Sequence, residues 1–464
     1  MTYASQACTD IARSRVQYAF AALENKPGVI AYPEKRHFIA ITNDATISQS
    51  PEYEDSTEKL GTRDITERFK NAMPAAQATL GMYLAVDDAL GAKPQGYDVL
   101  LSMFGSSTLT NPPVFKLGAA SATDTTIPLT EVDPLSPLPP CGVIEVRDTG
   151  ELIYFDDLSE DSMTMLRCKR GYKGTTADAI PQDAEGDYRS LAFLQSDCNP
   201  AFTYWLRTDH FTQGVTGATV NEASMSLSNA GAVNFEFSTV QGMESIMAGT
   251  AKMRATAPAG ATVIEVDLPK AYNEKALIWN STLKDHNGEV GYRIVSVNDL
   301  TGEITLDAPI SQAWPVDTVI GGYLPLGVKR LGDPIKGDTA EVLIDGVKGK
   351  LRSSSLSYSN NITYLNDEIG TRFPESYVED SRSVEFSMNT YFRKEDAVRF
   401  KEAYEGKFVS VRFVFGGGKV MLHMPKVQQS MPSPNMEPPT VSLDITGYAL
   451  ATGNGNNAVF LVFN

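Results

Sequence analysis

The sequence repeats part of itself at long range, and this repeat constrains the fold more than any other feature. Residues 45–63 (ATISQSPEYEDSTEKLGTR) align without a gap with residues 354–372 (SSLSYSNNITYLNDEIGTR), an offset of 309 from 45 to 354. One residue is then lost, and residues 79–90 align with residues 387–398 at an offset of 308. The shared order and spacing indicate an ancient duplication, so we expect two copies of one domain.

A second, different repeat is interleaved with the first. The segments that begin at Lys116 (KLGAASATDTTIPL) and at Lys252 (KMRATAPAGATVIEV) have a similar pattern of short apolar runs separated by Gly, Pro and Asp. The first continues to residues 151–154 and to RGYKGTT at 170–176, and the second continues to residues 291–306. Short strands with frequent turns are typical of small all-β modules.

The two repeats divide the chain into five parts. The expected parts are an N-terminal arm (1–36), a first large domain (37–115 and 196–250), a β module inserted into it (116–195), a second β module (251–328) and a second large domain (329–464). A surface loop tolerates such an insertion because the entropy of loop closure grows slowly with loop length.

Alternation of apolar and polar residues predicts that the large domains are built from strands with one buried face. The alternating segments are 220–228 and 233–239 in the first domain, and 383–392 and 441–448 in the second. Their polar faces carry Glu222, Glu236, Glu385 and Asp444, among short side chains such as Ser387 and Asn389.

Helices are expected to be few. Apolar residues at helical spacing predict a helix over 393–404, which ends before Gly406, and a counterpart over 96–104. Residues 5–24 are a third candidate helix. The predicted fold class is therefore mainly β: a duplicated β-sandwich or barrel, each copy with one flanking helix, plus two small β modules.

Two polar segments are expected to be long hairpin loops, because strand-like sequence flanks both of them. They cover residues 48–61 and 360–370, which occupy matching positions in the long-range repeat. Gly416–Gly418 lacks the Lys-Ser/Thr of a phosphate-binding loop and separates two apolar runs, so a hairpin turn is predicted there.

Acidic residues outnumber basic ones, and the formal net charge is −17. Proteins that bind nucleic acid normally have the opposite balance, and the simplest interpretation of the acidity is solubility. Four cysteines without a C-x-x-C pair are expected to be free thiols in a reducing compartment. No apolar stretch is long enough for a signal peptide or a membrane span, which predicts synthesis and assembly in a cytoplasm.

The sequence offers no constellation that usually carries catalysis or holds a cofactor. The Asp209–His210 pair has no G-x-S-x-G motif with it, and no His/Cys cluster has metal-binding spacing. The acidic pairs Asp156–Asp157 and Glu160–Asp161 are expected to be solvated turns. We therefore expect neither an enzyme nor a cofactor.

Several of these segments resemble the tail tube proteins of long-tailed bacteriophages. The run from Ala12 to Ser48 is similar to the opening of that family, with an arm, a proline break and a first strand. SPEYEDS at 50–56 and GTRDITERF at 61–69 continue the resemblance, and NNITYL at 360–365 resembles the C-terminal part of two-domain tube proteins. The module that ends in RGYKGTT resembles a small decoration of phage virion proteins.

The resemblance implies a structural subunit that forms stacked rings of three chains, each ring pseudo-hexameric, around a channel for genome delivery. It implies that the channel is lined by Glu222, Glu236, Glu385, Asp444, Ser387 and Asn389, where carboxylates and hydroxyls would let DNA slide without binding. The outer surface of the protein is the alternative location for these side chains. The loops would bridge stacked rings, together with the N-terminal arm, through Pro51, Glu52, Tyr53, Asp55, Ile362, Tyr364 and Asp367.

The resemblance also implies the partners and the location. The partners would be other copies of the chain, a tape measure protein, a tail terminator, distal tail or baseplate proteins, and the DNA in the channel, with no membrane. The protein would be synthesised and assembled in the cytoplasm of a host bacterium and would end in the virion tail.

Two other classes of protein stay open. A secretion-system tube would share the fold but is expected to have a shorter chain with one domain. A surface-exposed adhesive or carbohydrate-binding β protein would need an export signal. Such a protein would use aromatic side chains for sugar stacking, although core packing is their commoner role. The candidates for that groove are Trp205, Trp279, Trp314, Tyr204 and Tyr323.

Overall fold

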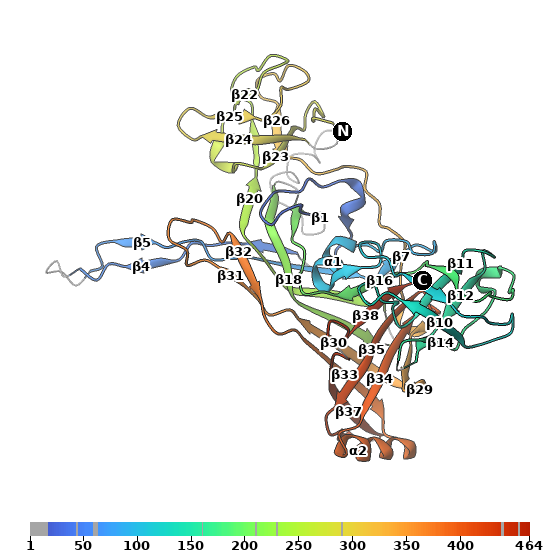
Figure 1. Ribbon diagram of the computed structural model, residues 1–464. Coiled ribbons are helices and arrows are strands. Elements are labelled where there is room, and N and C mark those ends of the chain that lie inside the picture. The colour runs from blue at the N-terminus through green and yellow to red at the C-terminus, as the bar shows by residue number, and fades with distance from the viewer. Residues whose placement is uncertain are drawn as a thin grey trace, which may run out of the picture.

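The protein is mainly β, with strands in several sheets and two α-helices in the part of the chain that the structure describes (Figure 1). The computed structural model describes residues 17–464 apart from 43–44, 59–63, 160, 209–210, 229–230, 289–290, 438–439 and 453–454. Cys8, the Gly61–Arg63 end of the first repeat, Glu160 and the Asp209–His210 pair lie outside these residues. Neither described helix has the length and apolar character needed to cross a bilayer.

Seven antiparallel strands form what we call the first unit. They are β1 (Tyr18–Leu23), β3 (Thr46–Ser48), β6 (Ala76–Tyr83), β17 (Phe202–Arg207), β18 (Thr212–Ser228), β19 (Asn234–Gly242) and β20 (Glu244–Ala248). The first half of β18 pairs with β17 and β20, and its later part pairs with β19, which continues the sheet through β6 to β3. The long strand β18 therefore belongs to two layers.

Seven more strands form the second unit with the same connections. They are β28 (Glu341–Ile344), β30 (Leu351–Ser359), β33 (Ser383–Tyr391), β34 (Phe408–Phe415), β35 (Val420–Gln429), β37 (Thr440–Ala449) and β38 (Phe460–Phe463). Here β35 pairs with β34 and β38 and then with β37, which continues through β33 to β30. One apolar core contains buried side chains from both layers of both units.

The strand registers of the two units agree over most of the paired residues. In the first unit Thr46 lies opposite Thr79, and in the second unit Ser355 lies opposite Ser387, at the offsets of 309 and 308 given by the sequence repeat. The β17–β18 and β34–β35 pairs agree as well, because Tyr204 lies opposite Val215 and Arg412 lies opposite His423, a common offset of 208 from 204 to 412. The β6–β19 and β33–β37 pairs agree too, because Gly81 lies opposite Glu236 and Asn389 lies opposite Asp444, at offsets of 308 from 81 to 389 and 208 from 236 to 444.

Two predicted helices are confirmed and the third is wrong. Helices α1 (Tyr97–Phe104) and α2 (Ala397–Tyr404) lie where the apolar spacing indicated. Residues 5–16 of the proposed helix over 5–24 lie outside the described residues, and the remainder contains β1, whose residues Ala19–Ala22 are buried on both faces and pair with β17. A short run that is apolar on every side does not distinguish a buried strand from a helix.

The predicted strands and the predicted turn agree with the structure. The four alternating segments lie in β18, β19, β33 and β37. Gly416–Gly418 connects β34 to β35, and all three glycines have positive φ, which only glycine adopts without strain.

Two smaller sheets lie outside the units (Figure 1). The first module contains β9 (Phe115–Leu117), β10 (Ile127–Val132), β11 (Gly142–Val146), β12 (Leu152–Phe155), β13 (Asp157–Leu158), β14 (Thr164–Leu166) and β15 (Ala184–Tyr188). The second module contains β21 (Thr250–Lys252), β22 (Val263–Glu265), β23 (Leu277–Asn280), β24 (Tyr292–Asn298), β25 (Glu303–Leu306) and β26 (Val319–Gly322). Lys116 lies opposite Glu185 and Lys252 lies opposite Val319, so the aligned lysines occupy matching strand positions.

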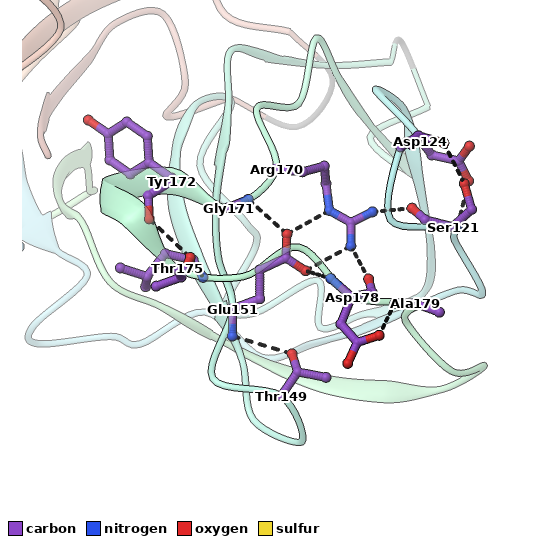
Figure 2. A network of polar contacts seen from close by, with 12 residues as sticks. Ser121, Asp124, Thr149, Glu151, Arg170, Gly171, Tyr172, Thr175, Asp178 and Ala179 are labelled. Carbon is purple, nitrogen blue, oxygen red and sulfur yellow. Dashed lines mark hydrogen bonds and ion pairs between the residues drawn. The ribbon is translucent and has the colours of Figure 1, made fainter.

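A buried ion pair explains the RGYKGTT motif of the first module (Figure 2). The Arg170 guanidinium donates to both carboxylate oxygens of Glu151, at 2.8 and 2.7 Å, and these side chains are 6% and 0% exposed. The backbone N–H groups of Gly171 and Asp178 donate to the same carboxylate. Because every oxygen of the buried carboxylate is bonded, the pair holds the loop after β14 against the hairpin before β12.

The first module also contacts the second unit through a buried arginine and two partly buried carboxylates. Arg412 on β34 is 4% exposed and contacts Asp156 at 2.5 Å and Asp157 at 3.1 Å. These two carboxylates, expected to be solvated, also bind Arg167. This pairing could not be predicted from local sequence because Arg412 lies more than 250 residues away from its partners.

The remaining described elements connect the units and the modules. They are β2 (Phe38–Ile39), β4 (Tyr53–Asp55), β5 (Arg68–Lys70), β7 (Ala85–Val86), β8 (Gly105–Ser107), β16 (Leu191–Gln195), β27 (Asp333–Pro334), β29 (Val347–Gly349), β31 (Ile362–Leu365), β32 (Ser376–Glu379), β36 (Ser433–Glu437) and five 3-10 turns, at Lys35–His37, Tyr172–Gly174, Pro269–Ala271, Gly337–Thr339 and Lys394–Asp396.

Candidate functional site

A single sheet runs without interruption from the first unit into the second. The second half of β18 pairs with β30, from Glu222 opposite Ser359 to Ser228 opposite Ser353. The sheet therefore has the strand order β3–β6–β19–β18–β30–β33–β37, and β36 pairs with the far side of β37.

One face of this sheet is dry and the other is wet. Phe235, Met225, Leu356, Phe386 and Ile445 are among the side chains that enter the core, and each is 1–2% exposed. The opposite face, which we call the polar face, carries side chains that are not buried: Thr46, Ser48, Gln77, Thr79, Asn234, Glu236, Glu222, Ser224, Ser226, Ser353, Ser355, Ser357, Glu385, Ser387, Asn389, Asp444 and Thr446.

The six side chains predicted to line a channel all lie on the polar face. Cross-strand register places Glu236 opposite Ser224, Ser224 opposite Ser357, and Ser357 opposite Glu385, in one row across four strands. Asn389 lies opposite Asp444 and donates to its carboxylate at 2.5 Å. Residues from two distant parts of the chain are thus brought to one surface, and its role as a channel lining stays a prediction.

Short hydroxyl side chains bond to one another along this face. The Thr46 and Thr79 hydroxyls are 2.9 Å apart, and the Ser355 and Ser387 hydroxyls, at the matching positions of the second unit, are 2.8 Å apart. Glu222 accepts a hydrogen bond from Thr239 at 3.0 Å. A surface that carries carboxylates among short hydroxyl side chains offers little to hold a phosphate.

Two hairpin arms take the place of the predicted long loops. Strands β4 and β5 form the first arm, β31 and β32 form the second, and both project from the same side of the molecule in Figure 1. Tyr53 lies opposite Lys70 and Ile362 opposite Glu379, a common offset of 309 from 53 to 362.

The two arms differ in what covers them. Pro51, Glu52, Tyr53 and Asp55 of the first arm are exposed or half-buried, and Asp367 at the tip of the second arm is exposed. Ile362 and Tyr364, however, are 3% and 7% exposed and pack with Met243 of the first unit. These two residues were expected to bridge rings, and that expectation is wrong because their own chain already buries them.

The hydroxyl of Tyr364 is held by the first unit. It lies 2.9 Å from the Thr219 hydroxyl and donates to the backbone carbonyls of Gly217, at 2.6 Å, and Gln241, at 3.0 Å. Burial raises the pKa of this phenol, and the hydrogen bond with Thr219 only partly opposes that effect, so the hydroxyl keeps its proton and remains a donor.

Further polar contacts that the sequence did not reveal complete the junction between the units. The side chain of Asn360 donates to the carbonyls of Met103 and Val220, and the Arg382 guanidinium donates to the oxygen of Asn360 at 3.0 Å. The backbone N–H of Asn199 donates to Glu379 at 2.8 Å. Only the NNITYL segment, through its family resemblance, pointed to this region.

The aromatic side chains proposed for a sugar-binding groove lie inside the protein. Trp205, Trp279, Trp314, Tyr204 and Tyr323 are each at most 6% exposed. They pack against other buried side chains, and some form edge-to-face ring contacts, as Trp314 does with Tyr292. They therefore present no surface on which a sugar ring could stack.

No group of three or more His, Cys, Asp or Glu side chains in the described ranges is placed to hold a metal ion. Comparison of the sequence with models of protein families and with curated proteins gave no match.

Proposed function

We propose that this protein is the structural subunit of a phage-type tail tube, which polymerises as stacked rings around a channel. The observation that carries the proposal is the continuous sheet from β3 to β37, with one dry face and one polar face. A closed ring of such sheets would bury the dry face within each wall and turn the polar face toward one lumen.

The equal strand registers support the inference that the two units are copies of one domain. The junction β18–β30 then joins one copy of the domain to the next within a chain. A similar junction between chains would place the following copy in the same relative orientation, so that successive copies turn around one axis. Three chains would supply six domains, which is a closed threefold ring with pseudo-sixfold walls. Closure would also remove the open strand edges, which otherwise promote aggregation.

The chemistry of the polar face suits a channel through which DNA passes. Glu222, Glu236, Glu385 and Asp444 give this face negative charge, with the cationic Arg352 at its margin, and an acidic wall repels phosphates. Two pairs of hydroxyls on this face, Thr46 with Thr79 and Ser355 with Ser387, lie within hydrogen-bond distance. The partners that we propose are therefore further copies of the chain, a tape measure protein and the proteins that cap the two tube ends, in a virion tail.

Electron microscopy of the purified protein in negative stain tests the proposal. Hollow rings or tubes are expected, and light scattering on separated rings should give the mass of three chains. A population that stays monomeric at high concentration, in crowding agents and after seeding with tube fragments contradicts the proposal.

A further inference from the structure

The junction between the two units inside one chain has two parts. The first is the pairing of β18 with β30. The second is the arm β31–β32, which packs on the first unit and buries Ile362 and Tyr364 there. If the units are copies, each part of this junction should have an unoccupied counterpart, one on the first unit and one on the second.

The counterpart of the second half of β18 is β36. Ser224 of β18 lies opposite Glu236, and Ser433 of β36 lies opposite Asp444, which occupies the position of Glu236 in the second unit. Among the described strands, β36 pairs with β37 alone, whereas β18 pairs on both sides. The outer edge of β36 is thus open where the matching edge of β18 is occupied.

The counterpart of β30 is β3. Thr46 and Ser48 occupy the positions of Ser355 and Ser357, as their pairing with β6 and β33 shows. Among the described strands β3 pairs with β6 alone, whereas β30 pairs with both β33 and β18. The sheet of one chain therefore has two open edges, one at β3 and one at β36. Each edge matches one of the two strands that form the β18–β30 junction inside the chain.

The arms show the same difference. Tyr53 occupies the position of Ile362, yet Tyr53 is 53% exposed and Ile362 is 3% exposed. Phe69, on the other face of the first arm, occupies the position of Val378, and these two are similarly exposed at 50% and 52%. The two arms therefore differ on one face only. The face of the second arm that carries Ile362 packs on the first unit, and the matching face of the first arm, which carries Tyr53, is exposed.

The second unit has exposed apolar side chains near the positions that match those holding the arm in the first unit. Tyr448 is 51% exposed and adjoins Ala449, which occupies the position of Gln241, whose carbonyl accepts a hydrogen bond from Tyr364 of the arm. Tyr404 at the end of α2 is 82% exposed, and Phe408 at the start of β34 is 46% exposed. Helix α1, the counterpart of α2, is instead almost entirely buried at the junction.

Charge favours the same pairing of surfaces. The first arm and its flanks are mostly acidic in the described residues, with Glu52, Glu54, Asp55, Glu58 and Glu67. On the second unit, Lys426 lies 4.3 Å over the ring of Phe408. Lys401 and Lys407 near Tyr404 are ion-paired with Glu405 and Glu402 of the same chain, so, of these three described lysines, Lys426 is the cation free to meet the first arm. Opposite charges at the rim of an interface steer association and fix its orientation.

We propose that a second copy of this chain occupies these surfaces, in a head-to-tail contact that repeats the internal junction. The outer edge of β36 pairs with β3 of the next copy, with Ser433 opposite Ser48 and Asn435 opposite Thr46, and the next copy's first arm covers Tyr404, Phe408 and Tyr448. This inference rests on the proposed ring-forming function and specifies which strands make the contact and in which register.

The open edge of β36 contains Pro434, which has no N–H. The carbonyl of Val441 accepts a hydrogen bond from Phe392, so Val441 faces β33 and the next residue, Ser442, faces β36. Asn435 lies opposite Ser442, so Pro434 beside it faces the open edge. Its carbonyl can still accept from the N–H of Ile47, while the missing donor discourages pairing with unrelated strands.

Engineered disulfides test the register. We expect Ser48→Cys with Ser433→Cys, in a background where Cys8 and Cys198 are serine, to give disulfide-linked chains in a denaturing gel, in a series that ends at three chains. The pair is non-hydrogen-bonded across the new contact, where Cα atoms about 4.5 Å apart suit a disulfide. Ser224→Cys with Ser357→Cys, the matched pair of the internal junction, should link only within one chain.

A single substitution tests the arm. Tyr53→Asp should leave a folded monomer that no longer assembles, as measured by circular dichroism and analytical ultracentrifugation. Phe69→Asp, on the opposite face of the same arm, should assemble like the unaltered protein. Equal loss of assembly in both variants would contradict the assigned face.

The outcomes separate this inference from the proposed function. Rings or tubes in which the Ser48→Cys/Ser433→Cys protein forms no links between chains would overturn the register and leave the function standing. Absence of any assembly by the unaltered protein would overturn both. Cross-linked rings that Tyr53→Asp does not prevent would retain the edge pairing and refute the role of the arm.

Discussion

The hydroxyl of Tyr364 donates a hydrogen bond to the backbone carbonyl of Gly217, 2.6 Å away, and so fastens the second unit to the first. The contact is buried, since Tyr364 is 7% exposed. Tyr364→Phe would leave the carbonyls of Gly217 and Gln241 without this donor, which costs about 1–3 kcal/mol of unfolding free energy. Urea unfolding of the monomer measures the loss, and Tyr53→Phe on the exposed arm, the control, should change it by less than about 0.5 kcal/mol.

The ion pair of Glu151 with Arg170 should make the first module sensitive to acid. Burial raises the pKa of Glu151, but hydrogen bonds from Arg170 and from the N–H groups of Gly171 and Asp178 outweigh it, so the pKa lies below its usual value of 4.5. A lowered folded-state pKa stabilises the protein above the unfolded-state pKa, and this contribution disappears as the pH falls through the folded-state pKa. We therefore expect the stability of the module to fall below about pH 4.5.

Substitution checks the same pair at neutral pH. Glu151→Gln leaves Arg170 buried without its counter-charge, and we expect a loss of about 3–5 kcal/mol, measured by thermal or denaturant unfolding. Glu145→Gln is the matched control in this module, because its partner Arg189 is half-exposed and such surface pairs contribute about 0–1 kcal/mol. Similar losses for both variants would contradict the importance of burial.

Thiol labelling should distinguish the cysteines by their burial. Burial raises the pKa of Cys141 and of Cys168 to about 12, so neither forms an appreciable thiolate near pH 8. Cys198 is exposed. In a Cys8→Ser protein, iodoacetamide should add one label to the native fold, at Cys198, and three after unfolding, as intact mass will show. Rapid native labelling of Cys141 would contradict the packing between the first module and the second unit.

Charge reversal on the polar face should create affinity for DNA. With Glu222→Lys and Glu385→Lys, the wall would carry cations that neutralise phosphates, and we expect binding of duplex DNA at low salt to tighten by roughly tenfold or more. Fluorescence anisotropy at several salt concentrations measures this effect. Glu274→Lys with Glu303→Lys makes the same charge change on the second module, and assembled tubes of that control should gain less affinity.

The sequence indicated much of the fold because its periodic segments are long. The alternation in 383–392 and 441–448 predicted β33 and β37, and the offsets of 309 and 308 agree with the observed registers of β3–β6 and β30–β33. Polar residues in those strands necessarily share a face, since side chains alternate along a strand. That is why the candidate residues are found together.

The errors arise where the local pattern carries little information. Ala19–Ala22 is apolar on both faces, and its strand character comes from pairing with β17, far along the chain. Ile362 and Tyr364 lie in a segment whose sequence is polar. The surface that buries them, around Met243 and Gly217, belongs to the first unit, which is distant in the sequence. Local sequence cannot show that one of two equivalent arms is covered and the other is not.

Within one chain, β18 (Thr212–Ser228) of the first unit pairs with β30 of the second, and residues 249–340, which include the second module, also join the two units covalently. The join that we propose between chains has no such segment and depends on hydrogen bonds and side-chain packing alone. Under tension or bending, the wall should therefore open between chains, and the fold within each chain should survive. Fragments of a sheared tube should contain whole subunits that can rejoin, so mechanical damage would be reversible at the level of the single chain.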